Sequence, residues 1–219
     1  MASPYYTKQP TYIEEPSGRF QNILAKEGEA LGYTEMGGGA RNTISYNTPS
    51  RINFPFTPTI SIIQSANYTS YDLTHTNFQQ RAFDMHTNME LNITAPMIVR
   101  SVEEALYVYK ASLWIRSTMK MSWMRDKIPG MPPPILRFYA HGIYENVPCI
   151  IRDFTWNLDS DIDYVEIIPD TKKPRKIMRI PVSNMFVLSL STTYSPKSIR
   201  ENFSVEDYLK GNLKDKGYV

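Results

Sequence analysis

Alternation of apolar and polar residues predicts most of the secondary structure of this chain. In residues 87–96 apolar side chains stand at every second position, as a strand with one buried face requires. Residues 55–64 place a β-branched run after two prolines, which is also typical of a strand. We expect these two strands to pair antiparallel, and we expect the polar residues 65–86 to form a long connection between them.

Residues 101–122 have the one strong helical pattern. Ser101 and Glu104 stand three apart, the spacing of a capping box at a helix N-terminus. Apolar residues at helical spacing predict the buried stripe, namely Val102, Leu106, Tyr109 and Leu113, while Trp114, Ile115 and Met119 either widen it or form a second apolar face. The helix is expected to end before the proline and glycine residues of 126–134.

The second half of the chain contains five further strand-like runs. They lie in residues 135–142, 149–158, 163–167, 176–182 and 185–194, with a turn at 143–148. In the last run Phe186, Leu188 and Leu190 predict one buried face. In the second run Ile150, Phe154, Trp156 and Leu158 are expected to share a face despite the interruption at Arg152. The prediction is a mainly β fold of two packed sheets, flanked by one helix.

One domain with extended ends is the expected organisation. Residues 51–195 form the domain, and residues 196–219 form a tail with a short helix capped by Ser204. Residues 1–50 are rich in proline, glycine and tyrosine, and they have too few apolar residues in a periodic pattern to bury a core of their own. They are either an arm that orders against a neighbouring chain or a disordered tail.

Composition and charge exclude several classes of function. The 219 residues include 24 basic and 22 acidic side chains, a net charge of +2, which is too balanced to indicate a nucleic-acid-binding surface. The single cysteine, Cys149, excludes an internal disulfide framework and indicates folding in a reducing cytosol. We see no signal peptide and no apolar run long enough to cross a membrane, so no membrane contact is expected.

Candidate catalytic and metal-binding residues have simpler interpretations. Asp159, Asp161 and Asp163 match the first positions of a calcium loop, but Tyr164 stands where such a loop needs glycine, so a turn between strands is favoured. The three histidines lack the spacing of metal ligands. Cys149 follows Pro148 in an apolar run and is expected to be a small buried side chain. We predict no catalytic residue, no metal and no cofactor.

Taken in order, several segments between Arg51 and Tyr208 resemble one known family. They are "INFPFTPTI", the connection "ANYTSYDLTHTNFQQRAFDMHTNMELNITAP", the helix "SVEEALYVYKASLWIRSTMKM" with "GMPPPILRF", "NVPCIIRDFTWNLDSDIDYVEI" and "IPVSNMFVLSLSTTYSPKSIRENFSVEDY". The family is that of the tail-tube-fold baseplate proteins of contractile-tailed bacteriophages, of the tail tube initiator type. The Tyr-rich segment before Arg51 is not part of the family's pattern.

The resemblance implies a tail-tube-like β-sandwich or rolled barrel with one flanking helix. It also implies a structural virion protein without enzymatic activity, located in the tail baseplate and assembled in the host cytoplasm. Six copies would form a ring that initiates or continues the tail tube, and DNA would pass transiently through its lumen. The implied partners are the tail tube protein, the baseplate hub and neighbouring ring proteins.

Alternation along the strands then suggests which residues face the lumen. A lumen wall that DNA slides along should be polar and short of positive charge. We expect this face to carry Asn88, Glu90, Asn92, Ser189 and Ser191, with Met89, Leu91, Phe186, Leu188 and Leu190 packed inside the domain. Contacts between rings are expected from the basic loop Lys172, Lys173, Arg175 and Lys176, which could instead be a solvated hairpin tip, and from Tyr5, Tyr6 and Tyr12.

Two other functions fit the same residues. One is a different assembly role in the virion, as an adaptor, terminator or cementing ring. The other is a carbohydrate-binding β-sandwich module, in which Trp156 or Trp123 would be a stacking platform for a sugar.

Overall fold

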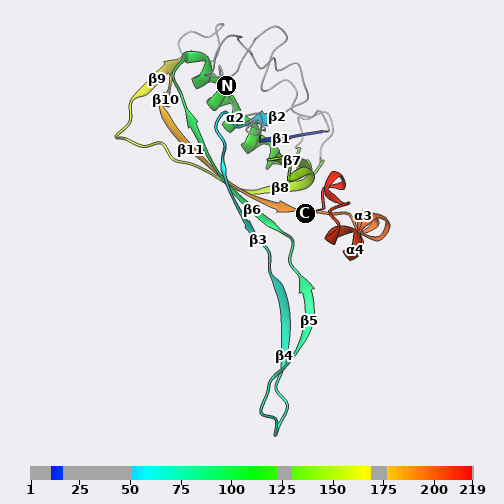
Figure 1. Cartoon of the computed structure of the whole chain (residues 1–219). Helices are drawn as coiled ribbons and strands as arrows, with labels where there is room; N and C mark the ends of the chain where they lie inside the picture. Colours follow the sequence, from blue (N-terminus) through cyan, green and yellow to red (C-terminus); the bar gives the residue numbers. More distant parts are fainter. Residues whose placement is uncertain (1–10, 17–50, 123–129, 169–176, 219) are drawn as a thin grey trace, which may run out of the picture.

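The computed structural model describes residues 11–16, 51–122, 130–168 and 177–218. These residues form a mainly β domain with one long helix, and a thin two-stranded arm projects from one end of the domain (Figure 1). The main sheet has seven antiparallel strands in the order β2-β1-β7-β8-β11-β6-β3. Their bounds are β1 Tyr12–Glu14, β2 Arg51–Asn53, β3 Thr59–Ile63, β6 Glu90–Ile98, β7 Leu136–Ala140, β8 Tyr144–Trp156 and β11 Ser183–Thr192.

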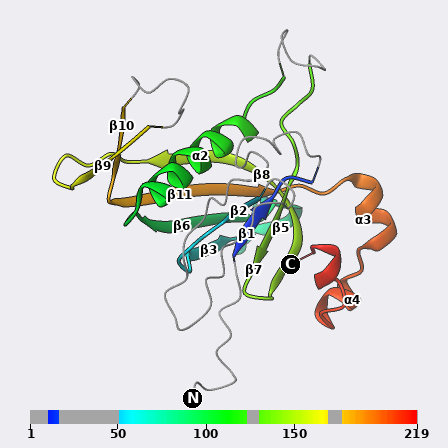
Figure 2. The ribbon, with the colours of Figure 1, turned by 90° about the horizontal axis from the view of Figure 1, so that it is seen from above.

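Strand β8 joins two halves of this sheet. Its first part pairs with β7 and its second part with β11, and the change occurs at Cys149, which is paired with both Leu136 and Thr192. Figure 2 shows β7 and β1 crossing the direction of β11 and β6, so the sheet bends sharply there. The expectation of two separate packed sheets is therefore wrong, because one continuous strand belongs to both layers, as at the corner of a rolled sheet.

Helix α2, Val102–Thr118, packs on one face of the sheet and begins as predicted. Ser101 Oγ accepts a hydrogen bond from the Glu104 backbone N–H at 3.2 Å, and the Glu104 carboxylate accepts one from the Arg100 N–H at 2.6 Å. The predicted stripe is correct in part: Trp114 and Ile115 are buried, and Leu106, Tyr109 and Met119 are partly buried against the core, but Val102 is 57% exposed. The most buried face also includes Ala105, Tyr107, Val108, Ala111 and Ser112, which were not predicted. Small residues let this face lie close to the sheet, and a pattern of large apolar residues does not reveal it.

Part of the N-terminal segment belongs to the domain. Strand β1 lies between β2 and β7, and Ile13 is paired with Ile52 and Phe138, all three fully buried. The Tyr12 ring stacks on Tyr139 at 4.6 Å. This corrects the boundary at residue 50 for residues 11–16, and Tyr12 packs within its own chain where a contact between rings was expected.

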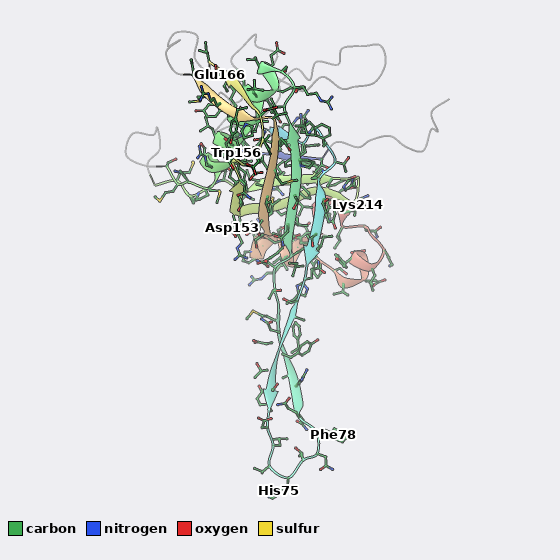
Figure 3. The ribbon with its side chains drawn as sticks, turned by 90° about the vertical axis from the view of Figure 1, so that its left-hand side faces the viewer. His75, Phe78, Asp153, Trp156, Glu166 and Lys214 are labelled. Atoms are coloured by element: carbon green, nitrogen blue, oxygen red, sulfur yellow. The ribbon has the colours of Figure 1, made fainter. Side chains whose placement is uncertain are left out.

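The polar connection 65–86 is a second departure from expectation. Strands β3 and β6 pair antiparallel as predicted, with Ile60 opposite Ile93. The residues between them are not an irregular loop: they form β4, Ala66–Tyr71, and β5, Gln80–His86, which pair antiparallel. Every residue of these two strands is exposed. We call residues 66–86 the hairpin arm; its tip carries His75 and Phe78 (Figure 3).

The remaining elements lie at the two ends of the main sheet. Strands β9, Tyr164–Ile167, and β10, Met178–Pro181, form a small hairpin of their own. At the other end, close to the base of the arm, β11 leads into α3, Pro196–Asn202, α4, Val205–Leu209, and the short 3-10 helix η1, Lys214–Lys216 (Figure 1). We call residues 194–218 the C-terminal module.

Candidate assembly surfaces

Four strands carry a polar face on the side of the sheet opposite the core. Along β6 and β11 the predicted inner residues Met89, Leu91, Phe186, Leu188 and Leu190 are all buried, which confirms that part of the prediction. Their neighbours Glu90, Asn92, Ser189 and Ser191 are half-buried on the open side, and Asn88 is exposed. The alternation was therefore assigned to the correct faces. That this open face lines a lumen stays a prediction.

The pairing register aligns polar side chains across the four strands. One row consists of Ser61, Asn92, Ser189 and Asp153, and the next of Ile63, Glu90, Ser191 and Ile150. In β3, β6, β11 and residues 149–156 of β8, the only basic residue is Arg152. Its guanidinium is bound by the Glu90 carboxylate, so no unpaired cation stands on this face. This open face, which we call the polar face, is not basic, and among its polar side chains it also carries the exposed apolar residues Ile63, Ile150, Met185 and Val187.

Arg152 also marks a bulge in β8. Ile151 pairs with Leu190 and Asp153 pairs with Ser189, so Arg152 is the extra residue. The bulge reverses the side-chain alternation, which explains why Phe154 and Trp156 point inward against Phe186. Ile150 and Leu158 were expected to share the buried face of Phe154 and Trp156. This prediction is wrong, because Ile150 pairs with Ser191 on the open side of the sheet, and Ile150 and Leu158 are 38% and 59% exposed.

The four-stranded half of the sheet has two edges without a partner strand in the described part of the chain. One is the outer edge of β3, the last strand of the sheet. The other is the outer edge of β8 after Cys149, where the pairing with β7 has ended. Apolar side chains on the core side of these edges are incompletely covered: Ile60 on β3, and Ile151, Phe154 and Trp156 on β8, are partly buried, and Ile62 is 46% exposed. Unpaired edges of this kind favour pairing with another chain.

The hairpin arm presents a third surface. Tyr68 and Phe83 face each other across the two strands with ring centroids 5.7 Å apart, and Phe78 near the tip is 84% exposed. An isolated two-stranded hairpin with no buried face is at best marginally stable in water. The arm is therefore suited to contact another molecule along its length.

The acidic turn has local partners. The Tyr164 hydroxyl donates to the Asp159 carbonyl at 2.5 Å, and Ser160 Oγ bonds Asp161 Oδ1 at 3.2 Å. In residues 11–16, 51–122, 130–168 and 177–218 no group of three His, Cys, Asp or Glu side chains is placed to hold a metal ion. The local contacts of Asp159 and Asp161 fit the turn between strands that the sequence favours.

Trp156 packs against the core of its own chain. Its indole N–H donates to Asn184 Oδ1 at 2.9 Å, and its ring packs edge-on against Phe186. Asn184 in turn donates to the carbonyls of Met97 and Pro181. A sugar-stacking platform at Trp156 is therefore not favoured, and Trp123 lies outside the described residues.

Cys149 is fully buried at the junction of β7, β8 and β11, as the sequence predicts. Burial raises the pKa of its thiol from 9.0 to about 12, and burial together with Tyr218 raises the pKa of Tyr194 from 10.0 to about 12. The unfolded chain loses both protons at lower pH than the folded chain. The unfolded state thus binds fewer protons between about pH 9 and pH 12, and stability falls as pH rises through this window.

We accordingly expect the free energy of unfolding to decline steadily above about pH 9. Urea titrations at intervals between pH 8 and pH 11 measure it. The Tyr194→Phe variant should decline less above pH 10, since it lacks one of the two groups. A wild-type curve that stays level to pH 11 would contradict the burial of these two groups.

Several predicted contact residues fall outside the described part of the chain. They are Tyr5, Tyr6, Lys172, Lys173, Arg175 and Lys176. Strand edges open to neighbouring copies were expected, but the sequence did not show that β3 and β8 carry them, nor that the C-terminal module forms a surface. The hairpin arm was also missed, because Tyr68 and Tyr71 stand three residues apart and residues 66–71 lack the two-residue period of a strand.

Comparison of the chain with models of known protein families finds no match, and comparison with curated proteins finds none either. No helix among the described residues is both long and apolar enough to pass through a membrane.

Proposed function

We propose that this chain is a structural protein whose copies join edge to edge into a ring around a channel. The observation that carries the proposal is the pair of free edges on the same four-stranded half of the sheet. A head-to-tail contact between two different edges of identical chains generates a ring when the rotation closes. The resemblance to tail-tube-fold proteins suggests six copies, in the baseplate of a phage tail.

Strand directions favour this contact. Strands β3 and β11 run one way, and β6 and β8 run the other way. Rotation about an axis along the strands preserves these directions, so β3 of one copy meets β8 of the next copy antiparallel. Because the half-sheet has an even number of strands, antiparallel pairing continues around the whole ring without a break. A closed barrel of this kind leaves no edge exposed.

The side chains at the two edges also complement each other. Ile60 and Ile62 on β3, and Ile151, Phe154 and Trp156 on β8, lie on the core side of the sheet and are only partly covered in one chain. Pairing of the edges would bring these apolar groups together and remove them from water, which contributes about 25 cal/mol for each Å² buried.

The polar face would then line the channel. It carries Ser61, Asn92, Ser189 and Asp153 in one row, with Arg152 bound to Glu90. Affinity of proteins for DNA comes largely from lysine and arginine contacts to phosphate. A wall without free cations lets DNA pass with little binding, as a phage tail tube requires. The hairpin arm continues β3 and β6 beyond the sheet, and in this arrangement it reaches along the channel axis toward a neighbouring ring.

Disulfide cross-linking tests the proposed contact. Ser61→Cys on β3 is combined in turn with Ile150→Cys, Asp153→Cys and Thr155→Cys on β8. Within one copy, two intervening strands hold β3 and β8 about 14 Å apart at a spacing of about 4.8 Å per strand. A disulfide needs Cα atoms within about 7 Å, so any bond formed must join two copies. We expect one of these pairs to give a ladder of covalent multimers after oxidation.

The positive control is Asn92→Cys with Ser189→Cys, since these residues are directly paired within one chain. This pair should form a disulfide without raising the mass of the chain. If the control closes and none of the three β3–β8 pairs yields multimers, the proposal is wrong.

A further inference from the structure

The C-terminal module is held in place firmly, yet its helices cover little of their own chain. Neither α3 nor α4 has a buried residue. Helices of this length are not stable alone and depend on packing against other structure. Five large apolar side chains of the module are exposed, namely Ile199, Phe203, Val205, Tyr208 and Leu209. Of these, only Tyr208 lines the groove described below.

The anchor of the module is its last turn. Leu213 and Tyr218 are buried, and the Tyr218 ring stacks on Tyr194 at 4.8 Å. The Tyr194 hydroxyl donates to the Gly217 carbonyl at 2.9 Å. Gly217 has φ of 79°, and a Cβ there would stand 2.3 Å from the Asn146 carbonyl oxygen, so only glycine fits this close approach to β8. The module is thus fixed rigidly beside the sheet.

A groove of about 510 Å³ lies between the module and the base of β3. Met89, Leu213 and Tyr218 are buried along it, while Ile62, Ile143 and Tyr208 keep 46%, 58% and 41% of their surface exposed. Gln64, Tyr144, Gly211 and Lys214 complete the lining. The groove is therefore mainly apolar and is built by three separate elements.

The position of this groove indicates what fills it. Ile62 belongs to β3, whose outer edge has no partner strand in the described residues. A strand added to that edge would direct alternate side chains toward the core side of the sheet, where the groove lies. Binding of an added strand commonly combines backbone pairing at an edge with pockets for alternate side chains.

We propose that the groove receives the apolar side of strand β8 from a second copy, and that the C-terminal module clamps the joint between copies. The inference rests on the proposed ring. The side chain that β8 offers at the level of Ile62 is Ile151, which one chain covers only in part. In this arrangement the C-terminal module contacts the β3–β8 pairing from the core side of the sheet, and the polar face on the opposite side lines the channel.

Two charge substitutions in the groove test the clamp. Tyr208→Glu and Ile143→Glu should each raise the protein concentration needed for half-assembly at least tenfold, because each places a charge in an apolar joint. Leu209→Glu is the matched control: Leu209 follows Tyr208, is 81% exposed and does not line the groove. It should assemble like wild type. Thermal unfolding of the unassembled chains checks that all three variants fold.

Photochemical cross-linking identifies the occupant. With Ile143→benzoylphenylalanine in assemblies of mixed isotope-labelled and unlabelled copies, we expect cross-links from residue 143 to β8 of a different copy. Cross-links to another segment, or within one copy, would overturn the inference, as would equal weakening by Leu209→Glu and Tyr208→Glu. If β3–β8 disulfides form normally in the groove variants, the proposed clamp is contradicted and the proposed ring is not. If those disulfides do not form in the otherwise wild-type chain, the proposed ring itself is contradicted.

Discussion

Ile13→Ala is expected to lower the free energy of unfolding by about 2–5 kcal/mol, the usual cost of removing a large buried aliphatic side chain. Ile13 is fully buried in the middle of the sheet, between Ile52 and Phe138. The three-residue strand β1 also pairs with both β2 and β7, so a cavity at Ile13 would weaken both strand pairings. Chemical denaturation followed by far-UV circular dichroism measures the change.

The control for this prediction is Ile62→Ala. Ile62 is 46% exposed at the edge of the sheet, so its truncation in the unassembled chain should cost much less, about 0.5 kcal/mol. If the two variants are equally stable, β1 is not part of the domain. Residues 11–16 would then belong to an arm outside the domain.

If the proposed ring forms, Asn92→Lys is expected to convert it into a DNA-binding ring. Asn92 stands at the centre of the polar face, paired with Ser61 and Ser189. Six added lysines that all reached phosphates would weaken binding about 10³-fold between 50 and 200 mM salt. Wild-type rings should show no comparable binding of short duplex DNA. Fluorescence anisotropy of labelled DNA at several salt concentrations measures both.

Val102→Lys is the control for the charge alone. Val102 is 57% exposed at the start of α2, on the side of the sheet away from the polar face. It adds the same charge to each copy, and its rings should bind DNA far more weakly than Asn92→Lys rings. Equal binding by the two variants would mean that Asn92 does not face an enclosed channel.

Local patterns in the sequence were sufficient to predict the centre of the sheet and the start of the helix. Buried and open positions alternate along β6 and β11, so the faces of residues 88–93 and of most residues in 186–191 could be assigned from the sequence. Ser101 and Glu104 placed the helix N-terminus correctly. In each case the signal lies within a few neighbouring residues, where side-chain periodicity and capping act directly.

The errors come from features that depend on distant parts of the chain. The bulge at Arg152 reverses the alternation of β8, and it is recognisable only from the partner strand β11. Ala105, Ala111 and Ser112 are buried because the helix approaches the sheet closely, not because they are strongly apolar. Strand β1 is too short for a periodic pattern, and its place in the sheet depends on residues 51–53 and 136–140.

The candidate surfaces were predictable only in part for the same reason. The polar face followed from alternation within β6 and β11, whereas the two free edges follow from the order of all seven strands. The groove beside β3 depends on how residues 208–218 return to the start of β8. Topology of this kind is not contained in any single segment.

The most direct test of the ring is cryo-electron microscopy of the purified chain after assembly at high concentration. We expect a closed ring, with a mass near six times the 25.3-kDa chain, in which β3 of each copy pairs antiparallel with β8 of the next. Particles in which the outer edge of β3 is covered by its own chain, or in which copies meet through other surfaces and enclose no channel, would contradict it.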